Sequence, residues 1–310
     1  MKLSLSTNWC NRRLATGEEI ADAALALGFE ELELGYHTTL AQTKGFKSRL
    51  DAIPVGSIHA FCPVPISAPQ GYPELYQLAS LNADARALAR IHVTRNIEFA
   101  AEMGADTVVL HAGRVAFSGL FRLLDTSVLR RVLLANKNDT ASKPYQNALA
   151  RAKSLRLKHG RRHLDIFKKE LDALIPVLEK NGVTLALENL PYYEGFPCEE
   201  ELAALRAAFD SAPIRGWFDT GHDRVRRMHR WYEGPIPTAD DARHFAGMHL
   251  NDVMDFTDDH LAPGMGKVDF AALKAFAHGV KHVVFEPTSS VSEADLRRGI
   301  AHIRSVWGLA

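Results

Sequence analysis

The chain has 310 residues, of which 46% are hydrophobic, and this is enough apolar material for one large domain or two small ones. Its 37 basic and 37 acidic residues cancel, which argues against a generic nucleic-acid-binding protein. Three widely spaced cysteines form no disulfide framework, and no apolar window has the length that a membrane span needs. We therefore expect a soluble, cytoplasmic protein.

Short apolar runs alternate with segments of helical periodicity along the whole chain. The predicted strands are Leu3–Ser6, Glu31–Leu34, Val55–His59, Asp106–His111, Val183–Glu188, Ile214–Asp219, Ala246–Leu250 and His282–Glu286. Helices are predicted at Glu18–Leu27, Asn82–Met103, His163–Lys180, Ala271–Ala277 and Glu293–Val306. This alternation predicts an α/β fold, a closed (β/α)8 TIM barrel formed by one domain over residues 1–310. A doubly wound open sheet is the alternative, but LSLSTNWCN at the first strand lacks its Gly-rich phosphate-binding turn.

A long basic segment interrupts the alternation after the fourth strand. From 114 to 162, twelve Lys or Arg stand against two Asp, so its formal charge is +10 and the rest of the chain carries −10. We interpret 114–162 as an insertion that leaves from the active face of the barrel. The spacing of Phe121, Leu124, Val128 and Val132 predicts that part of it is an amphipathic helix. It is either a lid packed on the acidic barrel or a source of a cation, such as Arg114, that grips a substrate phosphate or carboxylate.

His, Asp or Glu side chains stand at or beside the C-terminal ends of six consecutive predicted strands. They are His59, His111, Glu188, Asp219 with His222 just after it, His249 and Glu286. Because strands of a parallel barrel are buried on both faces, such side chains need a hydrogen-bonding, ionic or metal partner. Oxygen and nitrogen donors without a thiolate favour Mn²⁺, Zn²⁺, Mg²⁺, Co²⁺ or Fe²⁺. We predict that Glu188, Asp219, His249 and Glu286 bind a metal, and that His59, His111 and His222 are additional metal or substrate ligands.

Each of these residues also has a purely structural interpretation. A lone His59 or His111 is more often a hydrogen-bonded pocket histidine, and Glu188 alone could be an ion-pair partner. Asp219 could cap the helix that follows it. A further group stands after the seventh strand, where DDHLAPGMG places Asp258 and His260 two residues apart in a loop shaped by Pro and Gly. We predict that both contact a metal or the substrate. The alternative interpretation is an ordinary polar loop.

At these residues the chain resembles the xylose-isomerase-like TIM-barrel superfamily. The matching stretches are HAFCP, LHAG, LENLP, FDTGH, MHLND, DDHLAPGMGKVDF and FEP, in family order over nearly the whole chain. This superfamily contains sugar (phosphate) isomerases and epimerases and also endonuclease IV-type AP endonucleases. The resemblance implies a divalent-metal-dependent enzyme and a carbohydrate or sugar phosphate as its small-molecule substrate.

In ketose 3-epimerases of this superfamily, two Glu, an Asp and a His hold one metal, and the two Glu also serve as acid and base. The resemblance assigns these roles to Glu188, Asp219, His249 and Glu286, with Glu188 and Glu286 as the catalytic pair. It further implies that His222 and Glu194 contact substrate hydroxyls. Asp255 stands where these epimerases carry an Arg, and Leu190 stands where xylose isomerases carry a Lys. The chain therefore departs from a strict copy of either site.

Endonuclease IV holds three zinc ions with nine ligands, and nine residues of this chain match them. They are His59, His111, Glu188, Asp219, His222, His249, Asp258, His260 and Glu286. The favoured hypothesis is an isomerase or epimerase that binds one to three Mn, Zn, Co or Mg ions. A zinc phosphodiesterase, with nucleic acid as its partner, is the second hypothesis. The third hypothesis is a non-catalytic binding module that docks through the insertion. A homo-oligomer is compatible with all three hypotheses.

Overall fold

Eight parallel strands form a closed barrel in the computed structural model, which describes residues 1–117 and 126–309. Around the ring the strand order is β1-β10-β9-β8-β6-β4-β3-β2, so that barrel strands consecutive along the chain are neighbours. Every predicted strand is present with bounds close to those expected, and the predicted TIM barrel is confirmed. The strands are β1 (Ser4–Ser6), β2 (Glu31–Leu34), β3 (Val55–His59), β4 (Thr107–Leu110), β6 (Thr184–Glu188), β8 (Ile214–Asp219), β9 (Phe245–Leu250) and β10 (His282–Phe285).

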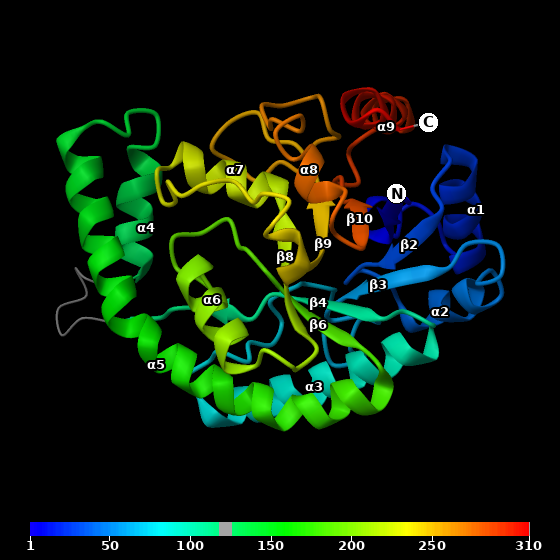
Figure 1. Cartoon of the computed structure of the whole chain (residues 1–310), viewed down its shortest axis with the longest axis horizontal. Helices are drawn as coiled ribbons and strands as arrows, with labels where there is room; N and C mark the ends of the chain where they lie inside the picture. Colours follow the sequence, from blue (N-terminus) through cyan, green and yellow to red (C-terminus); the bar gives the residue numbers. More distant parts are fainter. Residues whose placement is uncertain (118–125, 310) are drawn as a thin grey trace.

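Helices surround this barrel on its outside (Figure 1). Local signals set their ends: Thr16 and Glu19 form a capping box at the start of α1, and Gly28 ends it with φ of 85°. All five predicted helices are present, although α8 is shorter than expected, and α2, α6 and α7 were not predicted. The helices are α1 (Gly17–Leu27), α2 (Leu40–Lys47), α3 (Ala83–Glu102), α4 (Thr126–Ala135), α5 (Lys143–Asn181), α6 (Glu199–Ala208), α7 (Thr220–Met228), α8 (Lys274–Ala277) and α9 (Glu293–Trp307). Among the described helices, none is long and apolar enough to cross a membrane.

The interior of the barrel is filled by a small apolar cluster separate from the larger core between strands and helices. It consists of Val109, Ala186, Trp217, Ala246 and Val284. The Trp217 ring is fully buried and lies 5.0 Å from the His249 ring. A side chain at position 247 would meet that indole, since a Cβ built there lies 2.5 Å from it, so glycine is required. Trp217 thus supports the polar groups at the C-terminal end of the barrel from below.

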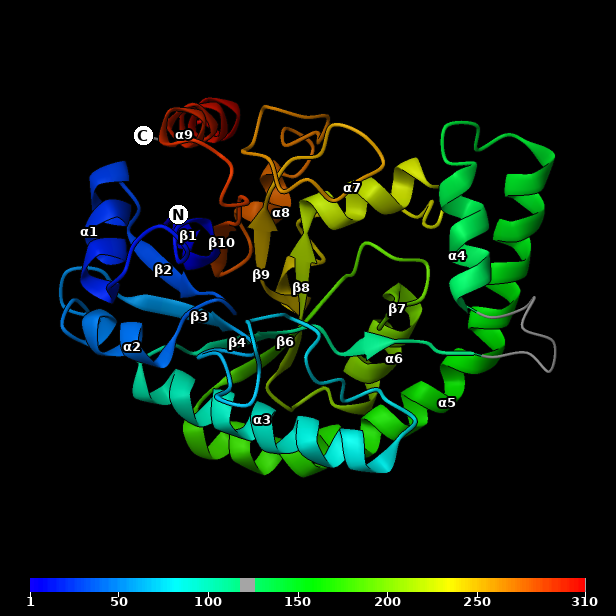
Figure 2. The ribbon, with the colours of Figure 1, turned by 180° about the vertical axis from the view of Figure 1, so that it is seen from behind.

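The basic insertion is largely helical and continues into the barrel's own helix. α4 and the first part of α5 lie side by side and project from one flank of the barrel, as Figures 1 and 2 both show. α5 runs without a break through position 162, so the predicted end of the insertion falls inside a helix. α4 is present where part of the insertion was predicted to be helical, but its buried residues are Leu129 and Leu133, whereas Val128 and Val132 of the predicted apolar face are half-buried. Phe121 and Leu124 lie outside the described residues.

Two contacts fasten this segment to the active face. β5 (Gly113–Arg114) pairs in antiparallel fashion with β7 (Gly195–Phe196), which joins the start of the insertion to the loop after β6. The buried hydroxyl of Tyr145, near the start of α5, donates a hydrogen bond of 2.5 Å to the carbonyl of His229 after α7. The insertion is therefore packed against loops that border the predicted site.

Candidate metal centre

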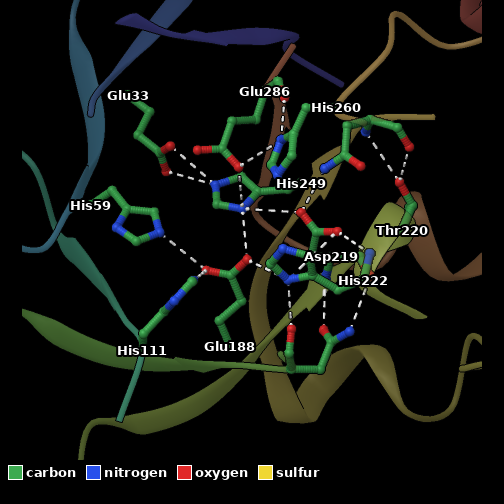
Figure 3. A network of polar contacts seen from close by, with 12 residues as sticks. Glu33, His59, His111, Glu188, Asp219, Thr220, His222, His249, His260 and Glu286 are labelled. Atoms are coloured by element: carbon green, nitrogen blue, oxygen red, sulfur yellow. Dashed lines mark hydrogen bonds and ion pairs between the residues drawn. The ribbon is translucent and has the colours of Figure 1, made fainter. Parts of the chain in front are cut away.

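The nine residues predicted as metal or substrate ligands converge at the C-terminal end of the barrel. Figure 3 labels all of them except Asp258. They form three groups, and within each group one ligand atom per residue lies within 4.8 Å of the others. The central group is Glu188, Asp219, His249 and Glu286; the His59 group is His59, His111 and Glu188; the loop group is His222, Asp258 and His260. Glu188 belongs to two of them. The structure thus brings together residues from the ends of six strands, from the first turn of α7 and from one loop.

The central group surrounds one nitrogen of His249. His249 Nδ1 lies 3.2 Å from Glu188 Oε1, 3.3 Å from Glu286 Oε2 and 3.6 Å from Asp219 Oδ2. Figure 3 shows the two glutamates reaching this imidazole from opposite sides. Three carboxylates and one imidazole within this radius offer the mixed oxygen and nitrogen donors that Mn²⁺, Zn²⁺ and Co²⁺ accept.

Asp219 combines two roles that were weighed as alternatives. Its Oδ1 accepts a hydrogen bond of 2.7 Å from the His222 amide and so caps α7. Its Oδ2 faces the central group and accepts a hydrogen bond of 2.7 Å from Asn251 Nδ2. Asn189 holds the backbone, because its Oδ1 accepts from the Asp219 amide at 2.7 Å. The helix cap is confirmed, and it leaves the second carboxylate oxygen available as a ligand.

The His59 group gathers around the other oxygen of Glu188. His59 Nε2 and His111 Nε2 each lie 3.1 Å from Glu188 Oε2. All three side chains are buried. Glu188 thereby stands between two groups, with one oxygen directed at each, as a carboxylate that bridges two cations does.

The loop group is held in place by a carboxylate outside it. Asp252 accepts hydrogen bonds of 2.8 to 2.9 Å from the amides of Gly264, Gly266 and Val268, which fixes the loop DDHLAPGMG. His222 Nε2 and His260 Nε2 then lie 3.2 and 3.3 Å from Asp258 Oδ2. His260 has φ of 44°, an uncommon conformation for a side chain of this size that the loop's own contacts maintain.

The histidines share a pattern that suits metal ligation. In each of four histidines, one ring nitrogen contacts a backbone carbonyl or a carboxylate that is not among the nine predicted ligands. The other ring nitrogen faces the other predicted ligands. For His59, His222 and His260 this partner is the carbonyl of Ala60, Asn189 and Glu286 respectively, at 2.9, 2.7 and 2.9 Å. For His249 it is the carboxylate of Glu33, at 3.0 Å. Such partners fix the tautomer and leave the second nitrogen's lone pair free for a cation.

Glu33 on β2 is a site residue that the sequence analysis missed. Its side chain is fully buried, and Ser57 donates a hydrogen bond of 2.9 Å to its Oε2. A signal was present, because Glu31–Leu34 alternates Glu with Leu in a strand that the barrel buries on both faces. A carboxylate in that position requires a partner, and His249 provides it.

The electrostatics of the groups also fit a cation. Burial raises the pKa of Glu188, but the imidazoles of His111 and His249 outweigh burial and hold this pKa well below its usual value. Burial lowers the pKa of His249, yet the charges of Glu286, Glu33 and Glu188 outweigh it and raise this pKa well above 6.5. Imidazoles that attract protons this strongly are sites where a metal can replace the proton.

A cavity of about 310 Å³ opens above the groups, and its size is that of a small-molecule site. Most of the nine residues border it, namely His59, His111, His222, Asp258, His260 and Glu286. Tyr36, Tyr72, Glu74 and Arg12 complete much of the wall. Glu188 lies directly beneath and does not border this cavity.

The two residues predicted to bind substrate, Arg114 and Glu194, do not border this cavity. Arg114 forms two hydrogen bonds to the Glu74 carboxylate, at 2.7 and 3.0 Å, and its guanidinium carbon lies 3.6 Å from the centre of the Tyr192 ring. Glu194 is buried and pairs with Arg130 of α4. The structure gives both residues partners in the protein, and their contact with substrate stays a prediction.

The arrangement of these residues on a closed parallel barrel agrees with the sequence comparison. The sequence model of the xylose isomerase-like TIM barrel family matches residues 21–306. The chain belongs to this family. No curated protein is significantly similar to it in sequence.

Solved structures of the same fold cover nearly the whole chain. A D-tagatose 3-epimerase-like protein is 18% identical, with a TM-score of 0.66 over 100% of this chain and 98% of that one. The 3-keto-D-glucoside 4-epimerase from E. coli is 15% identical, with a TM-score of 0.66 over 98% and 99%. A Thermus thermophilus protein, from a crystal soaked with ZnCl₂, is 20% identical, with a TM-score of 0.60 over 100% and 99%. At these identities the likeness shows the fold alone.

Proposed function

We propose that the protein is a divalent-metal-dependent isomerase or epimerase of a small carbohydrate or its phosphate, with Glu188 and Glu286 as the acid–base pair. One observation carries the proposal: both carboxylates approach His249 Nδ1, at 3.2 and 3.3 Å, and Glu286 borders a cavity of sugar size directly above this group. The fold shared with a 3-keto-D-glucoside 4-epimerase and with a D-tagatose 3-epimerase-like protein supports it.

The central group fits the metal that this reaction class uses. Glu188, Asp219, His249 and Glu286 would hold the ion, which when bound supplies a Lewis acid for adjacent hydroxyl and carbonyl oxygens. Asn251 and Asn189 orient Asp219, and Glu33 orients His249. The walls formed by Tyr36 and Tyr72 keep the substrate beside the carboxylates and reduce its contact with water.

The protein's own chemistry is a proton transfer at carbon. Glu286 borders the cavity, so its carboxylate accepts the proton from the carbon that carries a hydroxyl next to the carbonyl. Return of a proton to the neighbouring carbon gives isomerisation. Return to the same carbon from the other face gives epimerisation. We assign this return to Glu188, which does not border the cavity and would act from beneath it, within the central group. In both cases one C–H bond breaks and one forms, and in isomerisation a proton also moves from the hydroxyl oxygen to the former carbonyl oxygen. No oxidant or reductant is needed.

The direct test is solvent deuterium incorporation into a panel of ketoses and ketose phosphates, including D-fructose, D-tagatose and D-fructose 6-phosphate. The metal-loaded wild type should place deuterium on a carbon next to the carbonyl of at least one sugar. Glu286→Gln and Glu188→Gln should each reduce the exchange rate by about two orders of magnitude or more. Glu179→Gln, an exposed change on α5, should keep the wild-type rate. Normal exchange in both site variants would contradict the proposal.

A second candidate function, phosphoester hydrolysis by a multinuclear centre, is favoured by the His59 group and the loop group. A single ion in the central group leaves these five further residues for substrate contacts alone, whereas three ions would use all nine as ligands. Two assays decide between the candidates: metal analysis, and cleavage of bis(p-nitrophenyl) phosphate and of duplex DNA with an abasic site. Close to three zinc ions per chain together with phosphodiester cleavage would replace the isomerase proposal.

A further inference from the structure

A second cavity, of about 640 Å³, lies where the insertion meets the barrel. α5 forms one wall with Arg156 and Leu157, and the segments 190–201 and 231–234 form the others. Tyr192 borders both this cavity and the one above the metal groups, so the two are neighbours. None of the predicted metal or catalytic residues borders the second cavity, and the proposed function gives it no task.

The charges around the second cavity are balanced. Its walls contain four cations and four carboxylates, namely Lys153, Arg156, Arg161 and Arg226 against Glu199, Glu200, Glu201 and Glu233. Several of them pair with one another: Arg156 lies 2.8 Å from Glu201, and Arg226 lies 2.6 Å from Glu199. The excess positive charge of the insertion is therefore neutralised here. A wall without net charge but rich in donors and acceptors favours a neutral polar ligand over a phosphate.

The aromatic residues of the same walls limit the class of ligand further. Tyr192, Tyr193, Trp231 and Tyr232 all border the cavity, and the rings of Tyr193 and Trp231 meet edge to face with centroids 6.0 Å apart. Aromatic rings offer flat apolar faces, while their polar atoms and the neighbouring charged groups offer hydrogen bonds. This combination suits a molecule with both C–H faces and hydroxyl groups, which is the chemistry of a sugar ring.

We propose that the second cavity binds a second sugar unit, so that the protein prefers a neutral glycoside or oligosaccharide whose reacting unit keeps a carbonyl over the corresponding free monosaccharide. The reacting sugar lies above the metal groups, and its partner lies against α5, α6 and Trp231. The inference rests on the proposed function and extends it to the substrate class. It also gives the insertion a role, because α5 supplies one wall of the site.

Binding measurements on the metal-loaded full chain test the inference without requiring turnover. Lactulose, maltulose and isomaltulose, whose fructose unit keeps its carbonyl, are compared with D-fructose, glucose and galactose by isothermal titration and saturation-transfer NMR. The variants are Leu157→Glu, which adds a charge to the balanced wall from a side chain that is 80% exposed, and Trp231→Ala, which removes an aromatic face. Leu134→Glu is the matched control, because Leu134 is an exposed leucine of the same insertion that borders neither cavity.

At least one disaccharide should bind the wild type tenfold or more tightly than its constituent monosaccharides. Leu157→Glu and Trp231→Ala should remove most of that difference and leave monosaccharide affinity unchanged, while Leu134→Glu should retain it. Equal affinity for disaccharides and monosaccharides, or a preference that survives in both variants, would overturn the inference. Because the readout is binding, such a result would leave deuterium exchange by Glu188 and Glu286 as a separate test of the proposed function.

Discussion

Glu33 on β2 holds His249 on β9 across the interior of the barrel. His249 Nε2 lies 3.0 and 3.2 Å from the two carboxylate oxygens of Glu33, and the two residues are 216 positions apart in the chain. This contact turns His249 Nδ1 toward Glu188, Asp219 and Glu286. The geometry is that of a carboxylate that orients a metal-binding histidine.

Replacing this carboxylate should weaken metal binding even though Glu33 is not itself placed among the ligands. Glu33→Gln keeps the shape of the side chain but removes its charge and one acceptor oxygen. We expect its affinity for Zn²⁺ or Mn²⁺ to fall about 10- to 100-fold in a chelator competition titration. Glu30→Gln, an exposed change on the preceding turn, should bind as the wild type does. Unchanged affinity in Glu33→Gln would show that His249 is oriented by other contacts.

The His59 group and the loop group should be separable from the central group. His59→Ala removes one donor from the His59 group, and His260→Ala removes one from the loop group. Both leave the four residues of the central group in place. We expect both variants to retain one tightly bound ion after dialysis, as measured by inductively coupled plasma mass spectrometry. Complete loss of metal in either variant would mean that the three groups bind as one unit.

His282 at the opposite end of the barrel should make stability depend on pH. It is buried, and its ring nitrogens lie 3.1 Å from Glu31 and 2.9 Å from Asp106. Burial lowers its pKa, but these two carboxylates outweigh burial and raise it from 6.5 to about 9. The resulting stabilisation is fully present below pH 6.5 and is lost as the pH rises through 9.

Denaturant titrations between pH 6 and 10 measure this effect. The wild type should lose on the order of 2 kcal/mol of unfolding free energy over the window, a figure reduced from the full pKa difference because both carboxylates are partly exposed. His282→Gln should be less stable at pH 6 and nearly independent of pH in this window. His278→Gln, an exposed control, should retain the wild-type slope. The same slope in His282→Gln would assign the pH dependence to other groups.

The hydroxyl of Tyr145 should contribute to docking of the insertion. It is buried and donates to the His229 carbonyl, so Tyr145→Phe leaves a buried carbonyl without this donor. We expect a loss of about 1 kcal/mol in the free energy of unfolding and faster proteolysis of α4 and the start of α5. Tyr72→Phe, in a more exposed ring, is the stability control. Equal stability of the two variants would show that this hydrogen bond is replaced by water.

The barrel could be predicted well from the sequence because each buried strand is visible as a short apolar run. Val183–Glu188 and Ile214–Asp219 are apolar runs that end on a carboxylate, and neither needs knowledge of its neighbours to be recognised. Helices α6 and α7 were missed because their first turns are crowded with polar and charged residues, such as Glu199, Glu200 and Asp223. Glu199 on α6 and Asp223 on α7 both pair with Arg226 on α7. The Glu199–Arg226 pair joins the two helices, and such a tertiary contact is not visible in the sequence.

The site, too, could be predicted where a local sequence pattern marks a residue and not where its role depends on a distant contact. Residues at strand ends could be predicted because the barrel places all strand ends on one face. Glu33 and Glu74 could not, because their roles depend on partners far away in the chain, His249 and Arg114. The sequence also left the insertion as either a lid or a source of a substrate-binding cation. The structure shows several of its cations paired with carboxylates of the barrel, among them Arg114 with Glu74 in a loop and Arg156 with Glu201 on α6.

The central claim is that Glu188, Asp219, His249 and Glu286 form a divalent metal site, and metal analysis after purification and dialysis tests it most directly. The wild type should retain at least one Mn, Zn, Co or Mg ion per chain, and His249→Ala should retain markedly less while its circular dichroism spectrum stays that of a folded barrel. A wild type that retains no ion after incubation with each of these metals, or a His249→Ala variant with the same metal content as the wild type, would contradict the account.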